Sequence, residues 1–388
     1  MDLSFSDDQL AIQDAINKIC AKYGDDYWLK RDREGGFPED FVKDLADGGW
    51  LGIAMPPEYG GSGLGVTEAA LMMQTIAQSG AGMSGASAVH INLFGPHPIV
   101  VHGTEEQKAR MLPPLIAGRD RTCFGVTEPN AGLDTTSIET RAVKEGNRYI
   151  ANGRKIWTST GQSATKILLL ARTTPKDQVK KPTDGMTLFY TDLDRKYVEV
   201  REIEKMGRKA VDSNAVFIDG LPIPEENRIG EEGRGFHYLL DGLNPERIMV
   251  AAEAIGLGRL ALRKAVDYAR ERVVFGRPIG QNQAIQHPLA DSWAQLEAAD
   301  ALVWKAATLY DTGRPCGAEA NAAKYLAAEA GFHACERAVM THGGMGYAKE
   351  YHVERYMRES LINRIAPVSR EMILNFISQR VLELPRSY

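Results

Sequence analysis

Short runs rich in β-branched and aromatic residues are confined to the middle of this chain, and they limit its possible folds more than any other feature. The runs read "YIANGRKIWTST", "KILLLART", "MTLFYTD", "YVEVREI" and "NAVFIDGLPIP". Polar or Pro/Gly-rich segments separate them, as is typical of strands joined by turns. In the first run, the Asn-Gly pair favours a tight turn between two extended halves. The pattern predicts an antiparallel β domain.

Helical patterns flank this β region on both sides. Ser6 with Gln9, and Thr104 with Gln107, have the spacing of capping boxes, which begin helices. After the β region, one apolar stripe repeats every three or four residues, as expected of a helix. The stripe consists of Ile248, Ala251, Ile255, Gly258, Leu262, Ala265 and Ala269. Its small residues allow close helix packing, either inside one subunit or between subunits.

The length of 388 residues exceeds what one hydrophobic core usually supports. We therefore expect an α+β protein with three parts. These are an N-terminal helical domain over residues 1–119, a central antiparallel β domain over residues 120–230, and a C-terminal domain of the four-helix-bundle type over residues 231–388.

Composition excludes several classes of function. The formal charge of -5 is spread without long runs, which argues against nucleic acid as a partner. The start "MDLSFSDDQL" does not resemble a leader, and no apolar window approaches the roughly 18 residues of a membrane span. We expect a cytoplasmic protein without a metal site, because no His or Cys spacing suits one. The cysteines should be reduced and buried, at Cys20, Cys123, Cys316 and Cys335.

The stretch "LNPERI" poses the main question about function. Asn244 is a good helix N-cap, Pro245 suits the first helical position, and an acid at Glu246 would be favoured by the helix dipole. On these local grounds the acid has a structural role. The rest of the chain has to decide whether Glu246 also performs chemistry.

Several motifs resemble those of one enzyme family. "GVTEPNAGLDTTS" and "GGMGYAKEYHVERYMRE" look like the two signature regions of the acyl-CoA dehydrogenases, and "NGRKIWTS" and "RERVVFGRPIGQNQAIQH" stand in the same order as in that family. The resemblance covers essentially the whole chain. Leu133 and Met340 depart from the usual residues of the two signatures. The resemblance implies a three-part acyl-CoA dehydrogenase fold.

By the same resemblance, the chain is an enzyme that binds FAD non-covalently and oxidises an acyl-CoA to the trans-2-enoyl-CoA. A base removes the α-proton, hydride passes to flavin N5, and electrons then pass to electron-transferring flavoprotein. The assembly implied is a homotetramer, built as a dimer of dimers. The substrates implied belong to fatty acid or branched acyl-CoA metabolism, with chain length and branching left open.

The resemblance also implies which residues bind the cofactor and the substrate. The "FGVTEP" run offers backbone N–H groups and a hydroxyl to a polar ring edge, and the flavin candidates are Phe124, Val126, Thr127, Trp157 and Ser159. Another group matches positions from which a neighbouring subunit or a close backbone turn approaches the cofactor, namely Arg272, Phe275, Gln283, Gly343 and Gly344. Arg247 and Leu133 are the candidates on the substrate side.

The catalytic base requires a choice between two regions. Most members of the family carry it near the C-terminus, but here that stretch is "NRIAPVSREMIL", and neither Ala366 nor Pro367 accepts a proton. Isovaleryl- and long-chain-type members carry it in a Leu-x-x-Glu-Arg setting, which "LNPER" matches with Glu246 as the acid. The nearest competing acid, Glu371, lies within the expected final helix.

The backbone N–H at the C-terminal base position binds the thioester oxygen in the family. We expect Ala366 to hold that position, because Pro367 has no N–H to donate. Two other functions remain open. One is a related flavin enzyme on this fold, either a monooxygenase or an elimination (desulfinase) enzyme. The other is a non-catalytic scaffold that binds acyl thioesters.

Overall fold

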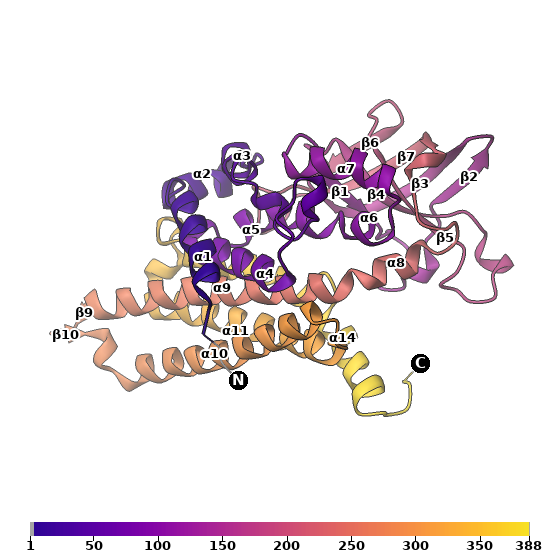
Figure 1. Cartoon of the computed structure of the whole chain (residues 1–388). Helices are drawn as coiled ribbons and strands as arrows, with labels where there is room; N and C mark the ends of the chain where they lie inside the picture. Colours follow the sequence, from indigo (N-terminus) through magenta and orange to yellow (C-terminus); the bar gives the residue numbers. More distant parts are fainter. Residues whose placement is uncertain (1–3, 388) are drawn as a thin grey trace.

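The computed structural model describes residues 4–387, in which helices precede and follow one central sheet (Figure 1). Both predicted capping boxes are present: the side chains of Ser6 and Thr104 accept hydrogen bonds from the backbone N–H groups of Gln9 and Gln107. These boxes begin the first and last of the N-terminal helices, which are α1 (Asp7–Cys20), α2 (Asp25–Glu34), α3 (Glu39–Asp47), α4 (Val66–Ile76), α5 (Gly82–Phe94), α6 (His97–His102) and α7 (Glu105–Ile116).

The middle of the chain forms an 8-stranded sheet in the order β6-β7-β3-β2-β4-β5-β8, with β1 added beside β4. Neighbouring strands run antiparallel, except that β1 and β2 run parallel to β4. The strands are β1 (Thr122–Gly125), β2 (Arg141–Glu145), β3 (Arg148–Ser159), β4 (Lys166–Arg172), β5 (Met186–Asp192), β6 (Val198–Glu202), β7 (Ser213–Pro224) and β8 (Arg228–Ile229).

The turn predicted at Asn152-Gly153 is wrong, because β3 runs straight through this pair. The register against β7 shifts between Ala151 and Gly153, so the pair forms a β-bulge. Glycine is required there because a Cβ on Gly153 would lie 2.6 Å from the Cα of Thr140. The Asn152 side chain is also used, since its Oδ1 accepts the Gly220 N–H at 2.8 Å.

Long helices make up the C-terminal part. They are α8 (Gly235–Asp241), α9 (Leu243–Glu271), α10 (Gln283–Asp311), α11 (Gly317–His342), α12 (Val353–Ser360), α13 (Ile362–Ile365) and α14 (Arg370–Phe376). The short strands β9 (Val273–Val274) and β10 (Arg277–Pro278) form a hairpin between α9 and α10. Figure 1 shows this hairpin at one end of the helical bundle, far from the sheet.

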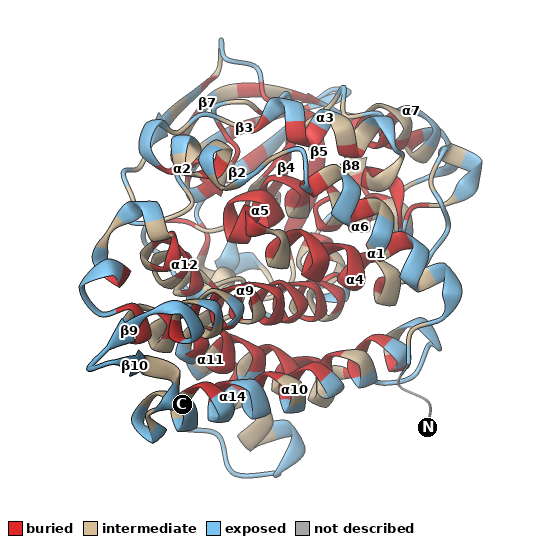
Figure 2. Ribbon diagram, turned by 90° about the vertical axis from the view of Figure 1, so that its left-hand side faces the viewer, coloured by how far each residue is buried: buried red, intermediate tan, exposed pale blue. Residues whose placement is uncertain are grey.

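The apolar stripe predicted for the second helical region lies on α9 and is entirely buried, which confirms the helical pattern. Small residues of α9, in the stripe and beside it, serve packing within the subunit. A Cβ on Gly256 would lie 2.3 Å from a carbonyl oxygen of α4, and one on Gly258 would lie 3.0 Å from the Cα of Gly331 in α11. Figure 2 shows α4, α5 and α9 as the buried centre of the molecule.

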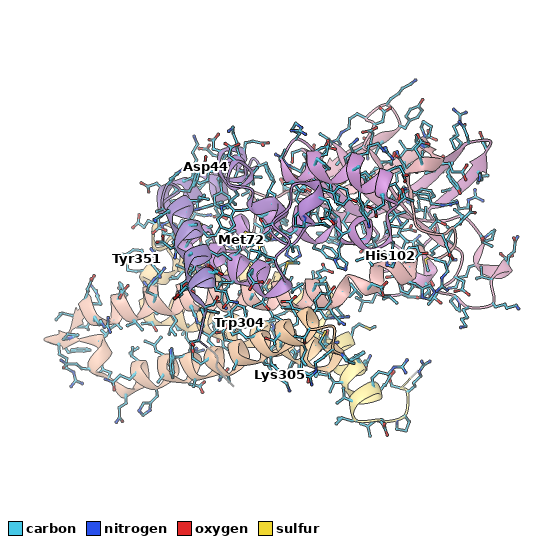
Figure 3. The ribbon with its side chains drawn as sticks, viewed as in Figure 1. Asp44, Met72, His102, Trp304, Lys305 and Tyr351 are labelled. Carbon is cyan, nitrogen blue, oxygen red and sulfur yellow. The ribbon has the colours of Figure 1, made fainter. Side chains whose placement is uncertain are left out.

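Contacts between distant segments close the structure. Figure 3 shows Trp304 on α10, and its ring meets that of Phe5 edge-on, with 5.3 Å between the centroids. The four cysteines are buried free thiols, as predicted. In the described part of the chain, no helix has the length and apolar character needed to cross a membrane.

Candidate active site

Glu246 lies in the first turns of α9, but the helix begins differently from the prediction. The expected N-cap at Asn244 is wrong, because α9 starts at Leu243 and the preceding Gly242 already has helical dihedral angles. α8 ends at Asp241, directly before that glycine, and so it leaves no open helix start for a side chain to cap. The Asn244 Oδ1 instead accepts a hydrogen bond from the Arg247 guanidinium at 3.1 Å.

The Glu246 side chain is buried, with 7% of the residue exposed. Burial raises the pKa of this carboxyl to about 7, although the charges of His90, Arg247 and Lys324 favour its ionised form. Among the described carboxyl groups with a resolved pKa shift, Glu246 is the only one whose pKa is raised. A carboxylate of this pKa is available as a base near neutral pH.

The other buried acids differ from Glu246 in having partners. Each forms a hydrogen bond or ion pair: Asp32 with Arg358, Glu128 with Lys155, Glu253 with His90, Asp300 with Gln74, and Glu359 with Ser84. Within residues 4–387, no hydrogen bond or ion pair involves the Glu246 carboxylate. Because buried polar groups are normally paired, an unpaired buried acid points to a functional role.

Two basic side chains lie near this carboxylate. The Arg247 Nε is buried without a hydrogen-bond partner, and burial lowers the pKa of the guanidinium. Lys324, on α11, is also buried, and its Nζ donates to the Val368 carbonyl at 2.8 Å. Burial lowers the pKa of Lys324 to about 8. The lysine therefore connects the C-terminal segment to the surroundings of Glu246.

That segment does not provide the donor expected for a thioester oxygen. The Ala366 N–H donates to the Ile362 carbonyl at 2.9 Å, so the preference for Ala366 as a donor is wrong. Pro367 has no N–H. The competing acid Glu371 lies in α14 with an exposed side chain beside Arg370. Neither the base nor the donor expected of a C-terminal site is present in this stretch.

The flavin candidates come together at the β1–β3 edge, the place where β1 and the segment after it lie beside the end of β3. The Ile156 N–H donates to the Thr127 carbonyl at 2.9 Å, which joins the segment after β1 to the end of β3. Nearby, the buried Lys155 binds both the Val126 carbonyl and Glu128. Trp157 is 56% exposed and has a positive φ of 60°, so its indole projects from the sheet.

This edge has hydrogen-bonding groups to offer. Within residues 4–387, no hydrogen bond uses the N–H of Val126 or Thr127, or the hydroxyl of Thr127 or Ser159. Phe124 packs its ring against Phe94 with 5.4 Å between centroids. An aromatic face and unused donors side by side suit a planar heterocycle with polar edges.

The second group of cofactor candidates lies at the opposite end of the bundle. Arg272, Phe275 and Gln283 surround the β9–β10 hairpin and are exposed, Phe275 fully so. Gly343 and Gly344 end α11 at the same place, where the ring of the preceding His342 stacks on Tyr268 of α9 at 4.2 Å. A Cβ added at either glycine would meet nothing within 4 Å. One chain alone therefore does not bring this group to the β1–β3 edge.

Leu133, a candidate on the substrate side, is 60% exposed in the loop before β2.

The sequence patterns did not reveal two ionisable residues near Glu246. His90 on α5, which is partly buried, and the buried Glu253 on α9 form an ion pair with 2.6 Å between the His90 Nδ1 and a Glu253 oxygen. Each stands alone as an ionisable residue in an apolar run, "ASAVHINLF" and "IMVAAEAIGLG", and that isolation was the available signal.

Three family models match the chain in succession. They describe the N-terminal, middle and C-terminal domains of acyl-CoA dehydrogenases and match residues 6–119, 123–221 and 233–382. The acyl-CoA dehydrogenase FadE12 of Mycobacterium tuberculosis is 38% identical over 100% of both chains. The caffeyl-CoA reductase-Etf complex subunit CarC of Acetobacterium woodii is 35% identical over 88% of this chain and 92% of its own length.

A solved structure is similar as well. Butyryl-CoA dehydrogenase from Megasphaera elsdenii superimposes with a TM-score of 0.93 at 32% identity, covering 98% of this chain and 100% of that chain. The similarity therefore extends over all three parts of the fold.

Proposed function

The chain belongs to the acyl-CoA dehydrogenase family, and from this premise we propose that Glu246 is the base that removes the α-proton of the substrate. The enzyme is a flavoprotein oxidoreductase that carries out FAD-dependent dehydrogenation of acyl-CoA thioesters. The observation that carries the assignment of the base is the unpaired, buried carboxylate with a pKa of about 7. A base at this position resembles the placement of the catalytic base in isovaleryl- and long-chain-type members of the family.

The proton transfer follows from the surroundings of Glu246. Near neutral pH a large fraction of this carboxyl is ionised, and no hydrogen bond from the described residues occupies its lone pairs. An acyl group that excludes the remaining water would strengthen the basicity of the carboxylate. Arg247 and Lys324 keep positive charge near the site, which stabilises the ionised base before it takes the proton.

The residues at the β1–β3 edge fit the family's cofactor. The unused N–H groups of Val126 and Thr127 and the hydroxyl of Ser159 would bind the polar edge of the isoalloxazine, and the exposed face of Trp157 would cover it. Phe124 would support the ring from the side of α5. When bound, FAD supplies the acceptor for the hydride that leaves the β-carbon.

We also propose an assembly of several subunits. The exposed Arg272, Phe275 and Gln283 would reach the cofactor of a neighbouring subunit, and Gly343 and Gly344 would leave room for its pyrophosphate. A fully exposed phenylalanine at a hairpin tip is a typical interface anchor. The proposed assembly is a homotetramer of two dimers, located in the cytoplasm. Within each subunit we place the domain limits at 119/120 and 230/231. Leu133 and Arg247 are proposed to lie on the substrate side.

Electron-transferring flavoprotein is the proposed electron acceptor. The name of one relative, a subunit of a caffeyl-CoA reductase-Etf complex, supports this partner. The same name favours a second candidate function, in which the redox step runs toward the saturated acyl-CoA. The direction can be tested by supplying either reduced flavoprotein with an enoyl-CoA or oxidised flavoprotein with an acyl-CoA.

The assignment of the base can be tested with Glu246→Gln. We expect this variant to keep its FAD absorbance but to lose the anaerobic bleaching of the flavin by acyl-CoA thioesters by about 10²- to 10⁴-fold. Glu371→Gln is the matched control, because that acid is exposed, and it should bleach like the unmodified enzyme. Unchanged bleaching by Glu246→Gln would contradict the proposal.

A further inference from the structure

A row of polar side chains lies on the buried face of α5. Ser84, Ser87 and His90 are spaced three residues apart and so lie on one side of the helix. Each bonds to a charged residue from another element: the Ser84 hydroxyl donates to Glu359 at 2.6 Å, the Ser87 hydroxyl accepts from Arg208 at 2.9 Å, and His90 pairs with Glu253. Burying polar side chains in a helix as apolar as α5 is unfavourable unless they have partners, so such a row points to a structural or functional role.

Arg208 reaches this row from the loop between β6 and β7. Its backbone has a φ of 55°, in the left-handed region that costs about 1 kcal/mol or more for a residue other than glycine. A guanidinium has five N–H donors, but the bond to Ser87 is the only hydrogen bond that the Arg208 guanidinium makes within residues 4–387. The strained backbone thus holds a guanidinium with unused donors.

His90 adds a second donor to the same place. Its Nδ1 faces Glu253, whose charge raises the pKa of the imidazole against the effect of burial. A protonated ring presents an Nε2–H, and within residues 4–387 this nitrogen makes no hydrogen bond. Since Ser87 lies one helical turn from His90, the guanidinium and the imidazole lie close together, and Glu253 is the one acid bonded to either of them.

Contacts link these donors to the proposed base and to Phe124 among the flavin candidates. Glu253 follows Glu246 by two turns of α9, and His90 exerts the largest charge effect on Glu246. The His90 ring also lies 5.8 Å from that of Phe94, which packs against Phe124. An acyl chain held between Glu246 and Phe124 would therefore lie near His90 and Arg208.

We propose that His90 and Arg208 form a donor site for the far part of the acyl group, and that the preferred substrates carry a hydrogen-bond-accepting oxygen there. The inference rests on the proposed role of Glu246. A plain hydrocarbon would cover the unused donors and leave them without water or an acceptor, which is unfavourable. A carboxylate, hydroxyl or keto oxygen would satisfy them.

The test compares thioesters of equal chain length with and without the oxygen. Alkanoyl-, ω-hydroxyalkanoyl- and ω-carboxyalkanoyl-CoA of several lengths are mixed anaerobically with the holoenzyme, and kcat/KM is measured from flavin bleaching. We expect one oxygen-bearing series to exceed the plain series by at least about tenfold at its best length. The hydroxyl and carboxylate series distinguish a neutral acceptor from an anion.

Variants link that preference to the two residues. Arg208→Met and His90→Phe should each reduce the ratio of oxygen-bearing to plain substrate, and Arg208→Met should also raise kcat/KM for the plain series. Lys209→Met removes a charge from the neighbouring exposed position and should leave the ratio unchanged.

The outcomes separate the two proposals. Bleaching by plain acyl-CoA that equals or exceeds the oxygen-bearing series at every length overturns the inference alone, whether or not the variants fold. An unchanged ratio in both variants does the same. If no thioester bleaches the flavin, the proposed function fails and this inference fails with it.

Discussion

Replacing Glu246 with glutamine should stabilise the protein by an amount that depends on pH. Burial raises the pKa of this carboxyl from its ordinary value of 4.5 to about 7, so the folded state binds the proton more tightly than the unfolded state. The stabilisation that comes from this tighter proton binding is complete at pH values below the unfolded pKa of 4.5. It is lost as pH rises through 4.5 toward 7, after which the protein keeps a buried, unpaired charge. Glutamine is neutral at every pH and avoids that penalty.

The magnitude follows from the shift in pKa. At about 1.4 kcal/mol per pH unit, a rise from 4.5 to about 7 makes the ionised carboxylate about 3 kcal/mol unfavourable in the folded state. Glu246→Gln should therefore raise the free energy of unfolding by about 3 kcal/mol near pH 8. Near pH 5, where most of the carboxyl is protonated in the folded state, the same linkage predicts a gain in the free energy of unfolding of only about 1 kcal/mol.

The assay is urea unfolding of the substrate-free holoenzyme, followed by tryptophan fluorescence at both pH values with FAD in equal excess. Glu371→Gln provides the control, because its carboxyl is exposed, and it should match the unmodified protein at both pH values. If Glu246→Gln were no more stable than the unmodified protein near pH 8, the carboxylate would not be buried and unpaired, and the argument for the base would lose its main support.

Three further predictions concern the same machinery. In stopped-flow bleaching, the rate for the unmodified enzyme should fall about tenfold per pH unit below pH 7 as Glu246 takes up a proton, and a flat profile would contradict this. Glu128→Gln leaves Lys155 buried without its partner at 2.8 Å, so the free energy of unfolding should drop by about 3–5 kcal/mol, whereas an unaltered urea midpoint would show that the pair contributes little. Phe275→Ala should keep the circular dichroism of the fold but lose FAD or tetramer on gel filtration, and retention of both would remove the hairpin from the proposed interface.

Local patterns predicted most of the fold. The two capping boxes and the apolar stripe of α9 depend on residues within four positions of one another, and such short-range geometry can be read directly from sequence. The turn at Asn152-Gly153 failed because the close approach of Thr140 and the bond to Gly220 made the pair a bulge. The N-cap at Asn244 failed because α8 runs directly into α9.

The sequence by itself determined the order of the three parts, the family and the residues that occupy its motifs, including the acid at Glu246. Only the tertiary structure decided which buried charges have partners. His90 lies 163 residues from Glu253, and Arg208 lies 121 residues from Ser87. The pairing of such distant groups is set by how α5, α9 and the β6–β7 loop pack. That packing leaves Glu246 unpaired among paired acids, because no helix or loop within residues 4–387 brings a hydrogen-bond donor to its carboxylate.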